Sequence, residues 1–439
     1  MIPGDTIVAA ATPFGYSGVA LVRISGPDAL VYAKRATGLR DPVERRATRA
    51  CFYDKDRVVI DNLIITSFRG PRSYTGEDVV EVSCHGNPAI IEEIVSTISS
   101  YGARFASPGE FTLRAFLNGK IDLLQAEATA SLIYSKSVEN AKNQQKIISG
   151  HLSKKLNVVR KTIIDNLSFL EHQMDISDED LDPAFLASLP TVLKKTQKEL
   201  TVIAGSFSAG RLLNYGARVV IAGPPNVGKS SLLNCLSGSN RAIVSDQPGT
   251  TRDLLDVELV LSGVPVRFID TAGIRAGGGA VEREGVARAK SSKKEADLVL
   301  YVTDDVKFKS VAKPETPTLF VVNKADLHAN QSVGVNIIHI SCLNKSGLGS
   351  LLNKIKLQLK INQVSSQNTY LSTPRQHQAV SLCASSLRSA ARLLSGGSAD
   401  LELLAFELRA GLYALDLLLG KTTADDILNN IFGSLCVGK

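Results

Sequence analysis

The 439-residue chain lacks the sequence features of membrane proteins, of secreted proteins and of proteins with cysteine-based metal sites. It has no uninterrupted apolar run long enough to span a bilayer, since even the most apolar stretch, residues 401–420, contains four charged side chains. No basic segment followed by an apolar one opens the chain, so we expect neither a signal peptide nor a membrane span. The six cysteines are scattered without a CxxC pair, which indicates a reducing cytoplasm and argues against a cysteine-based metal site.

The amino-acid composition is typical of a large globular protein. Hydrophobic residues make up 44% and charged residues 21% of the chain, which excludes intrinsic disorder and a small disulfide scaffold. The length predicts about three domains. The net charge of +7 lies wholly in residues 211–360, where 20 basic residues face 13 acidic ones, while the remainder of the chain balances. Such an excess permits a nucleic-acid partner but does not by itself indicate one.

The pattern of the chain changes three times and predicts four segments. Residues 1–118 indicate mixed α/β structure, residues 119–210 and 361–439 are helical, and residues 211–360 alternate strands with helices, as in a doubly wound parallel sheet. Two helical segments around an α/β unit predict that this unit is inserted into one helical domain. The elements expected are strands at 20–25, 58–68, 79–83, 218–222, 298–302, 319–322 and 337–340, a hairpin of 257–261 and 264–269, and helices from Pro88 to a cap at Gly102, at 123–133, 147–170, after Pro190, at 379–394 and at 401–418.

A glycine-rich loop directly after an expected strand predicts a phosphate-binding site. Residues 223–230 read Gly-Pro-Pro-Asn-Val-Gly-Lys-Ser and match GxxxxGK[ST] between a strand and a helix. Backbone N–H groups of such a loop close around phosphates at the positive end of the helix. Lys229 is expected to reach the β- and γ-phosphates and Ser230 to ligate Mg²⁺. The expected phosphate contacts are Asn226, Val227, Gly228, Lys229, Ser230 and Ser231.

Four more elements follow in order, and together with the loop they predict a GTPase. Residues 249–253 offer the Thr251 hydroxyl to Mg²⁺ and the γ-phosphate. In residues 270–273, Asp270 can hold Mg²⁺ through water and the Gly273 N–H can meet the γ-phosphate. The carboxylate of Asp326 can accept hydrogen bonds from guanine N1 and N2, which selects GTP over ATP. Residues 341–343 follow a further strand, where their backbone can contact the guanine oxygen. The expected contacts here are Gly249, Thr250, Thr251, Asp270, Thr271, Ala272, Gly273, Asn323, Lys324, Asp326, Ser341, Cys342 and Leu343.

The group that orients the attacking water is not where Ras-like proteins have it. These proteins place a glutamine directly after the DxxG element, and here that position is Ile274, which cannot orient water. Another polar group is therefore required, and Glu282 or Glu284 in the stretch that follows can supply it. Both glutamates can equally serve as first-turn residues of a helix, so the residues alone leave this choice open.

Motifs in every segment are similar to those of one family. They include Asp5-Thr-Ile-Val-Ala-Ala-Ala-Thr-Pro13, Gly18-Val-Ala-Leu-Val-Arg23-Ile-Ser-Gly26, Tyr74-Thr-Gly-Glu-Asp-Val-Val-Glu81, Cys84-His-Gly86, Pro108 through Glu127, and the terminal Phe432-Gly-Ser-Leu-Cys436-Val-Gly-Lys439. With these, the chain resembles the MnmE (TrmE) family of tRNA-modification GTPases. The resemblance implies an N-terminal α/β folate-binding domain that dimerises, a discontinuous helical domain, and an inserted Ras-like P-loop GTPase domain.

The resemblance also implies the reaction and its partners. Members of the family work with the FAD-dependent MnmG protein, as a heterotetramer, to add an aminomethyl or carboxymethylaminomethyl group to C5 of the tRNA wobble uridine. The one-carbon unit comes from 5,10-methylene- or 5-formyl-tetrahydrofolate. By positional match, Arg23, Glu81, Lys120 and Lys439 would contact the folate, and Cys436 is a candidate for a chemical or a packing role.

For the GTPase domain, the resemblance implies activation when two such domains pair. A potassium ion then takes the place of an arginine finger, with ligands from Asn226, Ser245, Gln247 and Thr250; Ser245 also joins the GTP contacts. Glu282 matches the water-orienting glutamate of the family. The chain departs from the family pattern at Pro224 in the phosphate loop, at Gln247-Pro248 in the first switch and at Gly277–Gly279 in the second.

Two other functions compete with tRNA modification. A ribosome-assembly or translational GTPase would use the same nucleotide site as a switch but would not need the block from Gly109 to Lys120 or the terminal Cys436–Lys439 motif. A folate-using enzyme regulated by its GTPase domain is the third hypothesis. Loss of the C5 substituent from wobble uridines in a strain without the protein would separate the first hypothesis from the others.

Overall fold

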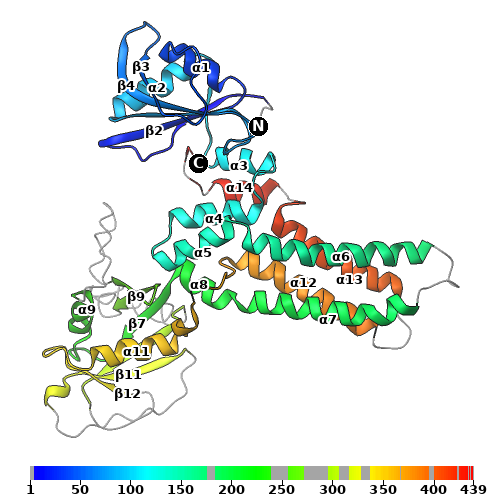
Figure 1. Cartoon of the computed structure of the whole chain (residues 1–439). Helices are drawn as coiled ribbons and strands as arrows, with labels where there is room; N and C mark the ends of the chain where they lie inside the picture. The colour runs from blue at the N-terminus through cyan, green and yellow to red at the C-terminus, as the bar shows by residue number, and fades with distance from the viewer. Residues whose placement is uncertain are drawn as a thin grey trace, which may run out of the picture. The chain divides into compact units, whose positions relative to one another are not determined.

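The structure is a computed structural model that describes residues 4–175, 183–238, 256–270, 295–305, 316–327, 337–365, 367–394, 400–422, 425–433, 435 and 437–438. The chain divides into two compact units, one of residues 1–133, 147–180 and 401–439 and the other of residues 134–146 and 181–400 (Figure 1). Within the described ranges, no helix has the combination of length and apolar character that crossing a membrane requires.

A six-stranded sheet forms the first part of the first unit. Its order is β3-β4-β5-β2-β1-β6, and β1 and β6 pair in parallel while the other pairs are antiparallel. Helices α1 (Ala29–Thr37) and α2 (Pro88–Ser100) pack against it (Figure 1). The strands are β1 (Ile7–Ala10), β2 (Ser17–Ser25), β3 (Thr48–Tyr53), β4 (Val59–Phe68), β5 (Val79–Gly86) and β6 (Arg104–Phe105).

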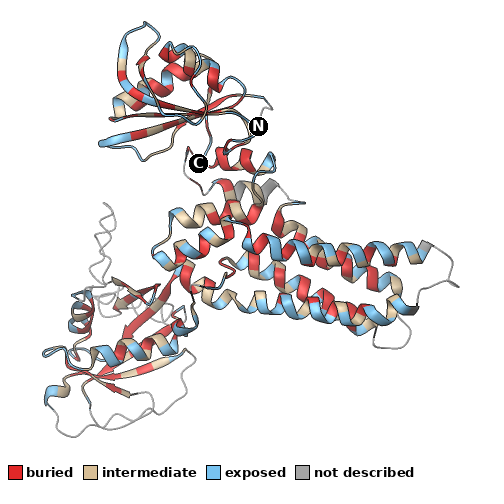
Figure 2. Cartoon of the chain, in the orientation of Figure 1, coloured by how far each residue is buried: buried red, intermediate tan, exposed pale blue. Residues whose placement is uncertain are grey.

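Helix α2 forms where the sequence predicts it, and its end differs by one residue. The Asn87 side chain accepts a hydrogen bond from Ala89 N and Pro88 occupies the first turn, as in other helix starts. Its apolar stripe is buried in the core beneath the sheet (Figure 2). The expectation of a cap at Gly102 was wrong, because Tyr101 caps the helix and Gly102 follows it at a φ of 120°.

Five helices complete the first unit. Helix α6 packs along α13, and Arg160 of α6 forms an ion pair with Asp416 of α13. The predicted helix at 147–170 was wrong at its start, because Gly150 adopts a φ of 81° and separates α5 (Val138–Ile148) from α6. The five are α3 (Glu110–Leu117), α4 (Leu123–Ile133), α6 (His151–Asp175), α13 (Leu401–Leu419) and α14 (Asp425–Gly433).

A buried ionic cluster joins α3 to the N-terminal strands. Arg114 has a side chain that is only 4% exposed, and it donates hydrogen bonds to Asp5, Glu77 and Glu110. Arg104 donates to Asp5 and Glu110 from the edge of the cluster. Burial raises the pKa of Asp5 and Glu110, but the hydrogen bonds and charges of the two arginines outweigh it and hold both pKa values below their usual range.

Replacing Arg114 with methionine is expected to destabilise the first unit by about 3 kcal/mol, because it removes the buried cation that the three carboxylates share. Glu77 then has no arginine partner among the described residues, and Asp5 and Glu110 keep only the partly exposed Arg104. The measurement is urea unfolding of the full chain. Arg104→Met is the matched control, and since the Arg104 side chain is 40% exposed it should cost about 1 kcal/mol or less. Equal losses for the two variants would contradict the assignment of Arg114 as the centre of the cluster.

The depressed pKa values also predict a pH dependence with a defined sign. Because Asp5 and Glu110 titrate lower in the folded than in the unfolded chain, their stabilisation is complete above the unfolded pKa values of about 4. It is lost as the pH falls through the lower, folded pKa values. We expect the stability difference between the wild type and Arg114→Met to shrink below about pH 4; a constant difference in urea unfolding from pH 7 to pH 3 would contradict this.

The second unit contains a six-stranded, mainly parallel sheet. Its order is β12-β11-β10-β7-β9-β8, and only the edge strand β8 runs antiparallel to its neighbour. The interior strands are near-continuous apolar runs, as expected for strands buried on both faces. They are β7 (Ala217–Ala222), β8 (Asp256–Leu261), β9 (Val264–Asp270), β10 (Leu298–Thr303), β11 (Thr318–Val322) and β12 (Ile337–His339), which confirms the predicted strands and hairpin to within a few residues.

The helices of the second unit lie beside this sheet and in a paired segment. Helix α7 packs along α12, which begins with a capping box between Thr373 and Gln376. The prediction of a helix start after Pro190 was wrong, because Pro190 lies inside α7, where Leu189 and Leu193 on either side are buried. The helices are α5, α7 (Pro183–Gly205), α8 (Phe207–Tyr215), α9 (Lys229–Ser237), α11 (Leu348–Gln358) and α12 (Pro374–Leu393), with short turns η2 (Ala325–Leu327) and η3 (Ile361–Gln363).

Candidate functional site: a guanine nucleotide site on the parallel sheet

The phosphate loop connects the central strand β7 to α9, as the sequence predicts. Gly223 has a φ of 148°, and an added Cβ would stand 2.0 Å from the carbonyl oxygen of Val302. At Gly228, with a φ of 93°, a Cβ would stand 2.2 Å from the side-chain nitrogen of Asn323. Asn226 also has a positive φ, 60°, and is exposed. Gly223 and Gly228 therefore require glycine for steric reasons, and the positive φ at position 226 favours asparagine or glycine.

Lys229 and Ser230, which the sequence predicts as phosphate and Mg²⁺ contacts, lie at the start of α9. The Lys229 ammonium is buried and donates to the carbonyl oxygens of Pro224, at 2.6 Å, and Gly223, at 3.2 Å. The Ser230 hydroxyl donates to the carboxylate of Asp270 at 3.2 Å, at the carboxyl end of β9. A hydroxyl beside a buried carboxylate is the oxygen set that Mg²⁺ prefers. The structure thus brings together two of the predicted metal-site residues, and Ser231 lies next to them, exposed.

The base-recognition residues form a second cluster, at the ends of β11 and β12. Asn323 donates from its amide nitrogen to Val227 O at 2.9 Å and accepts at its amide oxygen from Cys342 N at 3.3 Å. The Ser341 hydroxyl donates to the carboxylate of Asp326. One buried amide therefore ties the phosphate loop to the base loop, while Asp326 is held in a fixed orientation. Leu343 is 85% exposed beside it.

Two contacts at this site were not predicted from the sequence. Lys324 forms an ion pair of 2.7 Å with Asp304, which directly follows β10. The thiol of Cys235 on α9 donates to Cys342 O at 3.2 Å. Burial, and then the neighbouring Cys235, raises the pKa of Cys342 to about 12, so its thiol stays protonated. The position of Asp304 at the carboxyl end of a parallel strand was the available signal.

Several predicted residues lie outside the described residues. They are Ser245, Gln247, Gly249, Thr250, Thr251, Thr271, Ala272, Gly273 and Glu282 of the nucleotide site, the departures Pro248 and Gly277–Gly279, and Cys436 and Lys439 of the C-terminal motif. Their roles stay predictions.

The predicted folate residues are only partly brought together in the first unit. Arg23 donates to Glu81 at 2.7 Å and to Gly438 O at 3.2 Å, and its guanidinium lies 5.7 Å from the ring centroids of Tyr74 and Phe111. Lys120 instead donates to Pro71 O at 2.7 Å. It lines a cavity of about 470 Å³ whose lining does not include Arg23 or Glu81, both of which are described.

The strand order, the phosphate loop on β7 and the base loop after β11 define a Ras-like P-loop GTPase domain, carried here within a chain of helical segments. Residues 6–120 match the family model of the GTP-binding protein TrmE N-terminus, and residues 123–436 match that of the MnmE helical domain. The helical match extends to both sides of the GTPase segment, which confirms the fold class with its discontinuous helical domain and inserted GTPase domain. The chain belongs to the MnmE family of tRNA modification GTPases.

Relatives match the chain over its full length. The tRNA modification GTPase MnmE of Syntrophotalea carbinolica is 39% identical over 459 residues, covering 100% of both chains. That of Aquifex aeolicus is 36% identical and covers 99% of this chain and 100% of its own. Among solved structures, the G domain of the T. maritima FeoB iron transporter is 26% identical, covers 32% of this chain and 98% of its own, and has a TM-score of 0.23. A TM-score this low adds nothing to the strand order described above.

Proposed function

We propose that this protein hydrolyses GTP to drive modification of tRNA at C5 of the wobble uridine. The observation that carries the proposal is a guanine-type nucleotide site, with Asp326 oriented by Ser341 and Lys229 held by carbonyls of the glycine-rich loop, in a chain that MnmE relatives match from end to end. With an FAD-dependent partner of the MnmG type, the product is an aminomethyl or carboxymethylaminomethyl group. Its place of action is the cytoplasm, where tRNA is available.

The test of this function is the nucleoside content of tRNA from a strain that lacks the protein. Mass analysis of digested tRNA should show wobble uridines without the C5 substituent, and expression of the wild-type chain should restore it. A profile identical to that of the parent strain would refute tRNA modification and favour a ribosome-assembly or translational GTPase.

Different residues at the proposed GTP site bind the phosphates, the metal ion and the guanine base. The Lys229 ammonium, which donates to loop carbonyls in the structure, turns to the β- and γ-phosphates when they enter the loop. The Ser230 hydroxyl and, through water, the Asp270 carboxylate would hold Mg²⁺, which supplies positive charge for the phosphates. Asp326 accepts from guanine N1 and N2, and the backbone of Cys342 meets the guanine oxygen. Thr251 and Glu282 are proposed to complete the site at the γ-phosphate.

Potassium dependence is part of the proposal and has a direct test. Asn226, exposed in the phosphate loop, would ligate K⁺ with Ser245, Gln247 and Thr250 when two GTPase domains pair. We expect GTP hydrolysis to be about tenfold faster in potassium than in sodium, within the range of a single electrostatic stabiliser. Asn226→Gly keeps the positive φ of this position and should abolish the difference while GTP still binds. Equal rates of the wild type in both salts would remove the potassium site.

The N-terminal domain is proposed to bind tetrahydrofolate and to form the homodimer. Toward the described residues, Arg23 donates three hydrogen bonds from its five N–H groups, two of them to Glu81. An arginine and a carboxylate suit the glutamyl tail and the pterin edge, respectively. Phe14, Tyr16 and Val19 around the start of β2 are 69%, 86% and 64% exposed. Apolar side chains exposed together in this way favour burial against a second copy. The MnmG-type partner would then complete a heterotetramer.

A further inference from the structure

The turn between β8 and β9 is in close contact with the first turn of α5. Both central residues of the turn have positive φ, 49° at Ser262 and 85° at Gly263, as in a type I′ hairpin turn. A Cβ added at Gly263 would stand 2.4 Å from Cγ and 2.8 Å from Cβ of Glu139 in the first turn of α5. The glycine is therefore required by the closeness of α5 as well as by its own backbone conformation.

A second contact links the same hairpin to the residues before α5. The Lys136 ammonium forms an ion pair of 2.8 Å with Glu258 on β8. The lysine is exposed, so this ion pair contributes little to the free energy of folding. Its main effect is to hold residue 136 beside β8. Residues 134–146 belong to the compact unit of the parallel sheet, whereas the residues directly before and after them belong to the other unit. Most of helix α5 thus belongs to the same compact unit as the GTPase sheet, although the segments that precede and follow it in sequence belong to the other unit.

Helix α5 is also tied, one turn beyond Glu139, to the segment that leads into α12. Asn143 accepts from Tyr370 N at 2.9 Å and donates to Ser372 Oγ at 3.1 Å. Gln144 also donates to Ser372 Oγ at 3.1 Å, and both amides are buried. Leaving such buried amides unpaired would cost about 1–3 kcal/mol each. Helix α5 and the start of the α12 segment therefore move as one body.

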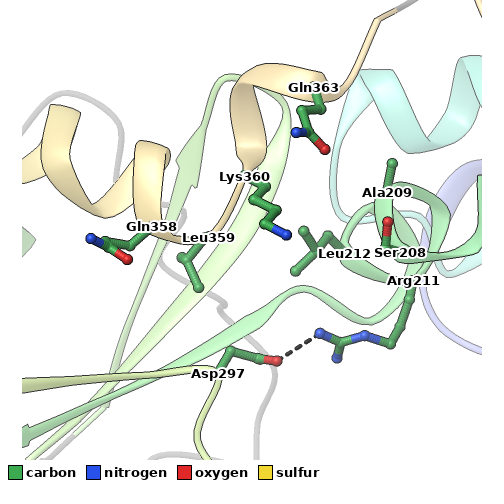
Figure 3. Close-up of a pocket in the computed structure, with 9 residues that line it drawn as sticks. All are labelled: Ser208, Ala209, Arg211, Leu212, Asp297, Gln358, Leu359, Lys360 and Gln363. Atoms are coloured by element: carbon green, nitrogen blue, oxygen red, sulfur yellow. Dashed lines mark hydrogen bonds and ion pairs between the residues drawn. The ribbon is translucent and has the colours of Figure 1, made fainter. Parts of the chain in front are cut away.

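A different junction joins the sheet to α8. Arg211 on α8 forms an ion pair of 2.6 Å with Asp297 (Figure 3). Asp297 also accepts a hydrogen bond from Arg218 N at 2.8 Å. The adjoining cavity of about 200 Å³ lies between α8, α11 and η3. Asp297 directly precedes β10, whose amino end faces away from the nucleotide loops. This junction lies at the amino end of β10, opposite the carboxyl ends of the strands that carry the nucleotide loops, so we take it as a fixed anchor between the sheet and α8.

The β8–β9 hairpin, by contrast, lies between the two predicted switch segments. It begins at Asp256, shortly after Gly249–Asp253, and ends at Asp270, which accepts from Ser230 in the phosphate loop. We propose that the contact of Gly263 with Glu139 transmits the nucleotide state of the GTPase domain, through α5, to the helical segments. This inference rests on the proposed function, because it supplies the coupling between GTP hydrolysis and tRNA modification. A shift of the hairpin toward α5 displaces the helix, because there is no space between Gly263 and Glu139 for even a methyl group.

The test introduces a methyl group at the contact. Gly263→Ala is expected to leave GTP hydrolysis within about twofold but to lower the modified uridine formed per GTP hydrolysed by about tenfold, the scale of one coupling free energy. Adding Glu139→Gly removes the atoms that the methyl group meets and should restore the ratio in the double variant. Ser262→Asn is the control, because asparagine tolerates the positive φ and leaves Gly263 unchanged.

Amide hydrogen exchange in α5 gives a readout that does not depend on tRNA modification. In the wild type, exchange at residues 138–148 should differ between the GDP-bound and GTP-analogue-bound protein with potassium, and Gly263→Ala should abolish this difference. If Gly263→Ala does not fold, Glu139→Ala loosens the same contact and should lower the ratio in the same direction.

Two results would overturn the coupling. They are an unchanged ratio in folded Gly263→Ala, and α5 exchange in the wild type that is indifferent to the nucleotide. If the wild type made no modified uridine while α5 exchange followed the nucleotide, the proposed function would fail and the coupling through α5 would stand.

Discussion

Replacing Asp326 with asparagine is expected to lower the affinity for GTP by about 10⁴-fold and to raise the affinity for xanthosine triphosphate. The aspartate carboxylate accepts from both N1–H and N2–H of guanine, whereas an asparagine amide places its own donor against one of them. Sites built to hydrogen-bond one partner reject a mismatched partner by about 10⁴–10⁵-fold, because buried polar groups are left unpaired. Xanthine has a carbonyl at C2, which can accept from the new amide.

The structure indicates that this exchange is local. The Ser341 hydroxyl donates to Asp326 Oδ1, and an asparagine oxygen can accept the same hydrogen bond, so the side chain keeps its orientation. The measurement is equilibrium binding of both nucleotides to the two proteins. Asp305→Asn, an exposed carboxylate two residues after β10, is the matched control and should leave both affinities within about twofold. Retention of the wild-type preference by Asp326→Asn would show that another group reads the base.

The parts of the fold predicted correctly are those with a local signal. The strands of the parallel sheet are short apolar runs, and the turn at Ser262–Gly263 has the residue types that its positive φ values require. The errors in the helix bounds occurred at Gly102, by one residue, and at Gly150 and Pro190. A left-handed glycine ended a helix that apolar periodicity continued, and buried leucines around Pro190 kept a helix intact where local propensity would end it.

The candidate site divides in the same way. The phosphate loop and the Asn323–Asp326 element were predictable because each motif directly follows its strand. The amide of Asn323 that joins the two loops, the Asp304–Lys324 pair and the fit of Gly263 to Glu139 depend on pairing between distant residues. The sequence contains the residue types for these contacts but no local pattern that pairs them, because chain folding alone brings them together.

Replacing Glu282 with alanine is expected to leave GTP binding within about twofold while lowering hydrolysis by about 10³-fold, the contribution of one well-placed group that orients or deprotonates water. Another residue has to orient the attacking water because position 274 does not supply a polar side chain. Ile274 stands where Ras-like proteins carry a water-orienting glutamine, and an alkyl side chain cannot hold the attacking water. Both residues lie outside the described residues, so the prediction rests on the sequence.

Glu284→Ala is the matched control for this role, since Glu284 is a second glutamate in the same stretch with the same charge. Single-turnover hydrolysis in potassium separates the two residues, because it reports the chemical step without product release. If the two glutamates merely favour the start of a helix, both variants should retain most of their activity, since such charges contribute about 0.3–1 kcal/mol. Loss confined to Glu282→Ala assigns the water to that carboxylate. Loss confined to Glu284→Ala would move the role by two residues and contradict the family match.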